Sequence, residues 1–303
     1  MTNPVFHPTL YTPATTSVEK QLALANGEHS GIWRVVLCTE DSIKEDDVPL
    51  AIDHLRVVLP KIKADSAVDT FVRVRNAEVM RRILDLPGAE KLRGFVIPKA
   101  DPESLPHYVG SLTGTSFSIM PILESSRMFD RNYRTALLHV VQGFSPVIEC
   151  LRIGANDLMG YLGIRRSAKD FTVYDTPVGG LIGEIICEYR GVGGFTITAP
   201  VFECFGPKYD PLLRKEVSQH ILNGLYGQTV IHPRHIRTIR DMYKVSKEDL
   251  ESARSIKANV SAVAGLHDRM DEYTTHWRWA DTILQRHALF GDDETSKTAT
   301  NIL

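Results

Sequence analysis

The sequence lacks paired cysteines. Its four cysteines, Cys38, Cys150, Cys187 and Cys204, lie far apart and form no Cys-x-x-Cys pair. This spacing removes the support for zinc-finger and thioredoxin-like sites, so a set of reduced intracellular thiols is the simplest interpretation. Cys38, Cys150 and Cys187 lie within apolar runs, where a cysteine usually acts as a small hydrophobic residue.

Long apolar runs and an excess of one charge are also missing. No run reaches the roughly 18 residues that a membrane-spanning helix needs. Residues 1–20 have neither the basic start nor the apolar block of a signal peptide, so cytoplasm is the expected compartment. The 35 Lys and Arg residues nearly balance the 37 Asp and Glu residues, which argues against binding to nucleic acid or an anionic membrane.

What the chain does have is the composition of an ordinary globular protein. Hydrophobic residues make up 43% of it and charged residues 24%. Its 303 residues are enough for one large domain or two ordinary ones.

Short apolar runs alternate with stretches of helical period. The runs predict strands at 9–13, 33–38, 70–75, 94–99, 117–123, 150–154, 194–200 and 228–233. Amphipathic helices are predicted at 46–62, 76–85, 125–140, 176–190 and 210–227, with Ser125 and Thr176 as N-caps. Repeated strand–helix units predict a parallel sheet, which closes most naturally into a (β/α)8 TIM barrel of the α/β class. A doubly wound open sheet is the alternative, but no Gly-x-Gly-x-x-Gly fingerprint follows the first strand.

The pattern changes after residue 233. Only helices are predicted there, at 234–244, 246–265 and 266–291, and the polar residues 292–303 are expected to fray. We therefore predict a TIM-barrel catalytic domain over residues 1–258. A C-terminal helical extension, or lid, would occupy residues 259–303.

Polar side chains gather where the predicted strands end, which is the face of a TIM barrel that carries active sites. In chain order they are Glu40, Asp41, Arg73, Arg75, Lys99, Glu124, Asn156, Asp157 and His232. Two carboxylates on neighbouring strands, Glu124 and Asp157, suit Mg²⁺, which often takes one or two protein carboxylates plus water and substrate oxygens. Such a metal can chelate a 2-oxo acid and stabilise an enolate. A nearby arginine can clamp a carboxylate and screen developing charge.

Each of these residues alone has a simpler explanation. Glu124 and Asp157 could interact with helix dipoles as N-terminal residues. Arg73 could form a structural ion pair with a neighbouring carboxylate. His232 is more simply a hydrogen-bonded loop histidine than a catalyst. The hypothesis of a metal-dependent active site therefore depends on all of these strand-end residues together.

With this set in view, the sequence resembles the citrate lyase beta-subunit-like branch of the HpcH/HpaI aldolase superfamily. Seven segments keep the order of that family over about residues 8–240: LYTPAT, CTEDS, FVRVRN, GFVIPK, ILES, RIGANDLMGYLG and VIHP. Each segment is a weak signal alone, but seven in order are fairly specific. Residues 270–291 resemble a bacterial branch described as C–C bond lyase-like.

The resemblance implies a Mg²⁺ ion held by Glu124 and Asp157, with Arg73 as the catalytic residue that grips the substrate and stabilises the enolate. It also implies a carbon–carbon lyase that acts on an oxo- or hydroxy-carboxylate, often as a CoA thioester, in a homo-oligomer. The residues expected to bind substrate are Arg75, Glu40, Asp41, Lys99, Gly154, Ala155 and Asn156. Among them, Glu40 and Asp41 would lie behind the metal or on its bound water.

The chain also departs from the family pattern. Gly227-Gln228 replaces the usual Gly-Lys before Ile-His-Pro, and residues 196–203 lack the aspartate of the seventh strand. Arg75 stands where asparagine is common, so Arg73 and Arg75 compete for the catalytic role. These changes weaken the expectation of a CoA substrate more than the expectation of a bound metal. A non-catalytic barrel that binds a metabolite or partner, and a metal-dependent CoA thioesterase, remain the alternatives.

The C-terminal extension offers candidates for an acid. In related lyases an aspartate from such a lid, over its own or a neighbour's barrel mouth, acts as the general acid. Asp268, Asp271 and His276 are the candidates here. The simpler explanation for each is a place on a solvated or interface helix.

Overall fold

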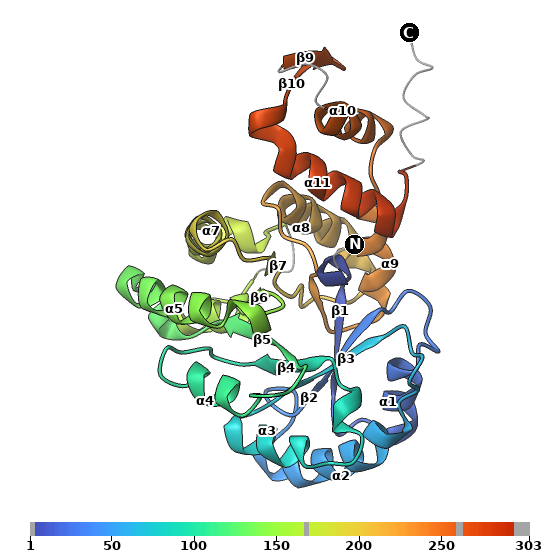
Figure 1. The fold of residues 1–303 in the computed structure, drawn as a ribbon, viewed down its shortest axis with the longest axis vertical. Helices are drawn as coiled ribbons and strands as arrows, with labels where there is room; N and C mark the ends of the chain where they lie inside the picture. Colours follow the sequence, from blue (N-terminus) through green and yellow to red (C-terminus); the bar gives the residue numbers. More distant parts are fainter. Residues whose placement is uncertain (1–3, 167–169, 259–262, 294–303) are drawn as a thin grey trace.

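The computed structural model describes residues 4–166, 170–258 and 263–293, and these form a parallel eight-stranded barrel with a C-terminal extension (Figure 1). The strands are β1 Thr9–Pro13, β2 Arg34–Cys38, β3 Asp69–Arg73, β4 Gly94–Ile97, β5 Ser118–Leu123, β6 Leu151–Ile153, β7 Ile197–Thr198 and β8 Thr229–Val230. Their order is β7-β6-β5-β4-β3-β2-β1-β8. Backbone hydrogen bonds from Ala199 N–H to the Tyr226 carbonyl (2.8 Å) and from Thr229 N–H to the Ala199 carbonyl (3.1 Å) join β7 to the segment of β8. The predicted TIM barrel is confirmed.

Helices follow the strands in the expected alternation. They are α1 Val18–Ala25, α2 Val48–Val58, α3 Ala77–Leu84, α4 Leu105–Gly110, α5 Arg131–Gly143, α6 Ala155–Tyr161, α7 Pro177–Ile185, α8 Asp210–Leu222 and α9 Arg234–Met242. The sequence did not predict α1, α4 and α6. With six and seven residues, α4 and α6 are too short to repeat an apolar face over several turns, whereas α1 is as long as the predicted α3.

The two predicted N-caps have different outcomes. Thr176 is the residue before Pro177 at the start of α7, as expected. Ser125 caps a short 3₁₀ turn, where its hydroxyl accepts the Arg127 N–H. The helix α5 begins later, because the carboxylate of Asp130 accepts the Asn132 N–H and so caps it.

Strand alternation explains why polar residues converge at one end of the barrel. The barrel interior holds a buried cluster of Val5, Val36, Phe71, Val96, Met120, Ile122 and Cys150. Side chains two positions apart on a strand point the same way. The next inward positions are therefore Cys38 on β2, Arg73 on β3, Glu124 after β5 and Arg152 on β6, and all four line one cavity.

The extension is not entirely helical, so the prediction of helices alone after residue 233 was wrong at 263–272. Between α10 (Lys247–Ala258) and α11 (Tyr273–Phe290), strands β9 Val263–Leu266 and β10 Arg269–Glu272 form an antiparallel hairpin. Its turn residues, His267 and Asp268, have φ of 54° and 58°. Such two-residue turns are usually marked by Asn-Gly or Asp-Gly, and this sequence signal is missing here. Residues 259–262 of the predicted helix and 294–303 of the predicted frayed tail lie outside the described residues.

The extension packs around an apolar cluster of its own. Val245, Leu250, Ala253, Ile256, Ala280 and Ile283 form this cluster, which joins α10 to α11 across the predicted boundary at residue 258. Arg286 of α11 donates to the carbonyls of Tyr243 and Lys244, both at 3.1 Å, at the end of α9. The division at 258 stays a prediction.

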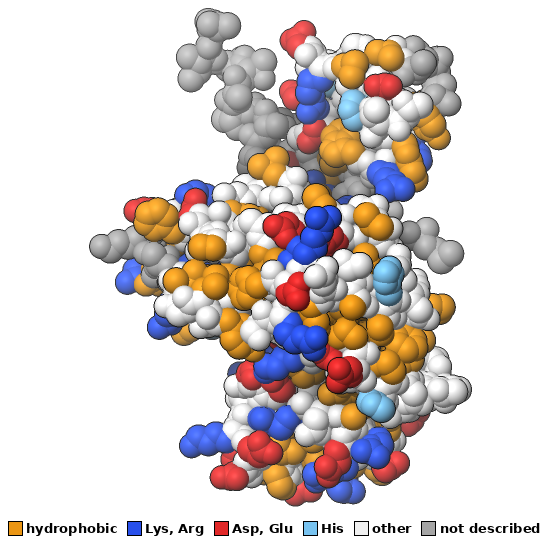
Figure 2. Space-filling model, turned by 90° about the vertical axis from the view of Figure 1, so that its left-hand side faces the viewer, with side chains coloured by type: hydrophobic (Ala, Val, Ile, Leu, Met, Phe, Trp, Pro, Cys, Tyr) orange, Lys and Arg blue, Asp and Glu red, His pale blue; other side chains and the backbone are white. Residues whose placement is uncertain are grey.

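Surface composition agrees with the balance of charges in the sequence. Figure 2 shows acidic and basic side chains interspersed over the face that it presents. Over the described parts of the chain, no helix has both the length and the apolar character to cross a membrane.

Candidate active site

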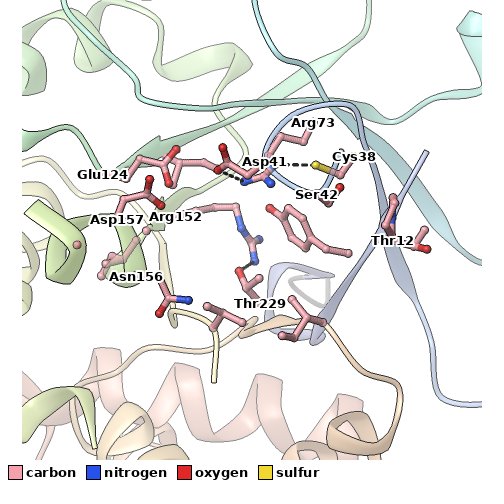
Figure 3. Close-up of a pocket in the computed structure, with 18 of the residues that line it drawn as sticks. Thr12, Cys38, Asp41, Ser42, Arg73, Glu124, Arg152, Asn156, Asp157 and Thr229 are labelled. Carbon is pink, nitrogen blue, oxygen red and sulfur yellow. Dashed lines mark hydrogen bonds and ion pairs between the residues drawn. The ribbon is translucent and has the colours of Figure 1, made fainter. Parts of the chain in front are cut away.

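A cavity of about 850 Å³ opens at the C-terminal ends of the barrel strands (Figure 3). This volume suits a small-molecule ligand. The residues predicted from sequence that line it are Asp41, Arg73, Glu124, Gly154, Asn156 and Asp157. The structure thus brings most of the predicted set together around one space.

The carboxylates of Glu124 and Asp157 lie at the same wall of this cavity (Figure 3). Glu124 is only 2% exposed, and its Oε1 accepts the N–H of Lys99 at 2.9 Å. Burial, together with the charge of Asp157, raises the pKa of Glu124 to about 7, although the Lys99 N–H and the charge of Arg73 act in the opposite direction. Two acids held this close repel each other, so a cation between them would stabilise the arrangement.

Lys99 connects the two acidic parts of the site. Its φ is 45°, in the left-handed region that residues with side chains rarely occupy. In this conformation its N–H points to Glu124, and its Nζ reaches Oε1 of Glu40 at 2.8 Å. Unusual backbone geometry is often found where a site must be held in place, and here it orients the buried carboxylate.

Arg73 is fixed by several partners. Its Nη1 lies 3.2 Å from Oε2 of Glu40 and 3.5 Å from Oδ2 of Asp41, and its Nε donates to Sγ of Cys38 at 3.0 Å. Burial favours the neutral form of Glu40, but the charge of Arg73 and hydrogen bonds with Asp41 and Lys99 hold the pKa of Glu40 below its usual value. Arg73 therefore has both the structural ion pairs and the cavity position that the sequence left as alternatives.

Arg75 has a different environment. Its Nη2 donates to the carbonyls of Glu40 (3.1 Å) and Ile43 (2.9 Å), so it holds the loop after β2. Arg75 is not part of the cavity lining, and neither is the buried Ala155. Of the two competing arginines, the geometry favours Arg73.

His232 and the candidates in the extension lie outside the cavity lining. The ring of His232 stacks on Phe205 at 5.2 Å, and its Nδ1 accepts the N–H of Arg234, as expected of a loop histidine. Asp268 lies in the hairpin turn, Asp271 is buried in β10, and Nδ1 of His276 accepts the N–H of Glu272. An acid supplied by the extension stays a prediction.

Arg152, Tyr11 and Thr229 also line the cavity, although the sequence did not single them out. Arg152 on β6 is 2% exposed and donates from Nη2 to Oγ1 of Thr229 at 2.6 Å. The guanidinium groups of Arg73 and Arg152 both lie 5.5 Å from the ring centroid of Tyr11. The signal was an arginine inside the apolar segment CLRIG, since a buried charge needs a partner or a purpose.

The residues present fit Mg²⁺. No group of three or more His, Cys, Asp and Glu side chains able to hold a metal occurs among the residues that the structure describes. Mg²⁺ commonly takes only one or two carboxylates and fills its other positions with water and substrate oxygens. Glu124 and Asp157 offer hard oxygens on one cavity wall, and burial, followed by the charge of Asp157, raises the pKa of Glu124.

Gly154→Ala is expected to destabilise the protein by about 1–3 kcal/mol, as overpacking does in other cores. A Cβ at this position would lie 2.2 Å from Oε2 and 2.4 Å from Cβ of Glu124. Gly160→Ala is the control in the same segment, because its Cβ would meet nothing within 4 Å. In helix α6 that change should be neutral or stabilise by up to about 1 kcal/mol. Urea unfolding of both variants measures the difference, and equal stabilities would contradict the packing argument.

Comparison with known proteins places this geometry in a family. A family model described as C-C bond lyase of the TIM-barrel fold matches residues 6–292. A search of curated protein sequences finds no match.

Solved structures share the fold at low sequence identity. The CitE protein of Mycobacterium tuberculosis, in complex with magnesium, acetoacetate and coenzyme A, is 18% identical with a TM-score of 0.68, over 94% of this chain and 99% of that one. A citrate lyase of Burkholderia xenovorans LB400 is 14% identical with a TM-score of 0.70, over 95% and 93%. The citrate lyase beta subunit of M. tuberculosis, complexed with oxaloacetate and magnesium, is 18% identical with a TM-score of 0.55, over 80% and 99%.

The resemblance noted in the sequence is therefore confirmed. The matched model covers almost the whole chain, and the barrel with its strand-end cavity agrees with it. The chain belongs to the C-C bond lyase family of the TIM-barrel fold, and its enzyme class is that of a carbon–carbon lyase.

Proposed function

We propose that this protein is a Mg²⁺-dependent lyase that breaks or forms a carbon–carbon bond in an oxo- or hydroxy-carboxylate, free or as a CoA thioester. The observation that carries the proposal is the buried Glu124 beside Asp157, with Arg73 in the same cavity. Similar folds solved with magnesium and acetoacetate or oxaloacetate support it.

The residues divide the work of the reaction. Bound at Glu124 and Asp157, Mg²⁺ would supply a Lewis acid that polarises the oxygens of the substrate. In a hydroxy acid, a base takes the hydroxyl proton, that oxygen becomes the carbonyl of one product, and the electron pair of the broken carbon–carbon bond stays on the other product as an enolate, which then takes up a proton. In an oxo acid, water adds to the carbonyl first, and that fragment leaves as a carboxylic acid. Arg73 donates hydrogen bonds to the oxygen on which negative charge develops. Glu40 forms an ion pair with Arg73 and so fixes its position. Lys99 donates its backbone N–H to Glu124 and its Nζ to Glu40, and so orients both carboxylates.

Asp157→Asn is expected to weaken Mg²⁺ binding by at least about tenfold, because it removes one anionic ligand without changing the shape of the side chain. Calorimetric titration with and without pyruvate measures this, and wild-type binding should tighten when pyruvate is present. Asp130→Asn is the control, since this N-cap of α5 lies outside the cavity lining and asparagine also caps helices.

The same titration tests the first alternative, and an assay of the products tests the second. Absence of Mg²⁺ binding by the wild type, with and without the oxo acid, would contradict the proposal and favour a non-catalytic barrel. Release of free CoA from a thioester without an oxo acid or aldehyde product would instead identify a thioesterase.

The proposal includes a homo-oligomer and a lid function for residues 259–303. Both follow from the resemblance to the family. Light scattering during size-exclusion chromatography tests the oligomer.

A further inference from the structure

Arg152 is a buried charge inside the barrel that faces the cavity. It is 2% exposed and extends from β6 toward Thr229 (Figure 3). Its Nη2 donates to Oγ1 of Thr229 at 2.6 Å and to the carbonyl of Gly227 at 3.4 Å, and its Nη1 lies 3.7 Å from Sδ of Met120. A thioether is a weak acceptor, so the hydroxyl is the one good partner among these three.

Other buried arginines of this protein are compensated better. Arg34, Arg134 and Arg166 each form an ion pair with at least one glutamate. Arg286 donates to two carbonyls at the end of a helix, where a positive charge is favoured. Over residues 4–166, 170–258 and 263–293, no carboxylate forms an ion pair with Arg152, whereas Arg34 and Arg166, whose Nε also lack a hydrogen-bond partner, each have a glutamate.

A guanidinium group buried without an anion is costly, and an anion from a ligand would remove this cost. The cavity supplies the route, because Arg152 is part of its lining together with the two acids of the proposed metal site. A guanidinium binds a carboxylate through two parallel hydrogen bonds, and Nη1 of Arg152 faces the weak acceptor Sδ of Met120 at 3.7 Å. Arg73 is less suited to this second anion, since Glu40 and Asp41 already pair with it.

We propose that Arg152 binds a second carboxylate of the substrate, so that the site selects oxo- or hydroxy-dicarboxylates over the matching monocarboxylates. The inference rests on the proposed function, in which the first carboxylate lies at the metal formed by Glu124 and Asp157. Arg152 then determines specificity, while Arg73 stabilises the developing charge. A purely structural role for Arg152, as filler of the barrel interior, predicts no such preference.

Two pairs of ligands test the preference in the wild-type protein. Pyruvate and oxaloacetate differ by one carboxylate on C3, and 2-oxobutyrate and 2-oxoglutarate differ by one carboxylate on C4. Competition calorimetry with Mg²⁺ present gives the affinity ratio within each pair. In at least one pair the dicarboxylate should bind about tenfold or more tightly.

Variants assign the preference to a residue. Arg152→Met removes the charge but keeps an unbranched side chain, and it should bring the two ligands of the preferred pair to within about threefold of each other. Binding of the monocarboxylate should change little. Arg286→Gln removes another buried arginine outside the cavity lining and should keep the wild-type ratio. If Arg152→Met does not fold, the wild-type comparison can still overturn the proposal, because equal affinities within both pairs would exclude a second carboxylate site.

The outcomes separate this inference from the proposed function. Mg²⁺-dependent binding of both ligands with equal affinity in both pairs would overturn the role of Arg152 and leave the lyase proposal intact. A preference that persists in Arg152→Met would assign the second carboxylate to another residue. Failure of every oxo acid to bind with Mg²⁺ would overturn the proposed function and this inference with it.

Discussion

Arg73→Lys is expected to lower the rate of enolate formation by about 10²- to 10³-fold while changing ligand affinity much less. Lysine keeps the positive charge but loses the planar fork, so it cannot pair with Glu40 and also present a second N–H group to the substrate. In Arg73, Nη1 faces Glu40 and Nε donates to Cys38, and Nη2 has no hydrogen bond or ion pair with any of the described residues, so it is the group that can reach the substrate.

Exchange of the methyl protons of pyruvate in D₂O, followed by proton NMR with Mg²⁺ present, measures enolate formation without requiring the natural substrate. Arg75→Lys is the matched variant, because Arg75 follows on the same segment but donates to the carbonyls of Glu40 and Ile43. Its effect should stay below about tenfold. A larger loss in Arg75→Lys than in Arg73→Lys would reverse the assignment of the two arginines.

The barrel was predictable because its evidence is local and repeated. Each strand is a short apolar run closed by glycine, proline or a polar residue, and such runs recur along the chain. The same runs place Glu124 and Asp157 at strand ends, where parallel strands bring them to one face. Period-two alternation then predicts that Arg73 points inward from β3.

Other features depend on contacts that the sequence does not display. Arg73 and Arg75 are two positions apart, so alternation alone cannot distinguish them, and the difference arises because β3 ends at Arg73. The left-handed conformation of Lys99 accompanies the hydrogen bond from its N–H to Glu124, a residue 25 positions later in the sequence. The sequence around Arg152 does not reveal that no carboxylate pairs with it. The pairing depends on which side chains lie opposite Arg152 in the closed barrel.

Glu124→Gln is expected to stabilise the metal-free protein by about 3 kcal/mol at pH 8, although it removes a residue of the proposed metal site. Burial and the neighbouring Asp157 raise the pKa of Glu124 from 4.5 to about 7. Above pH 7 the folded protein must therefore hold a charge that the unfolded chain exposes to water. Glutamine is neutral at every pH, and its carbonyl can still accept the N–H of Lys99.

The sign of this effect depends on pH. Below about pH 4.5 Glu124 is protonated in both the folded and the unfolded chain, so the two proteins should have similar stability. As pH rises from about 4.5 to about 7, the unfolded chain releases the proton before the folded protein does, and the wild type loses stability that the variant keeps. Urea unfolding in EDTA between pH 5 and pH 8 measures the widening gap.

Glu149→Gln provides the opposite control. Burial disfavours the charge of Glu149, but Arg34, Ser118 and Arg93 hold the pKa of this carboxyl below its usual value. Replacement should therefore destabilise the protein at pH 8, because it leaves Arg34 buried without its anion. The change in stability on replacement by glutamine would then have opposite signs at the two glutamates. Glu149 is paired with an arginine within the fold, whereas Glu124 is held beside a second acid.

Addition of Mg²⁺ should reverse the order of wild type and Glu124→Gln. A cation that binds the folded wild type stabilises it by mass action, whereas the variant lacks one of the two anionic ligands and gains little. Holding Glu124 beside Asp157 lowers the stability of the metal-free protein, and a bound cation would restore it. If Glu124→Gln were no more stable than the wild type in EDTA at pH 8, the two carboxylates would not be in conflict, and the main physical reason to assign a metal to this wall would be lost.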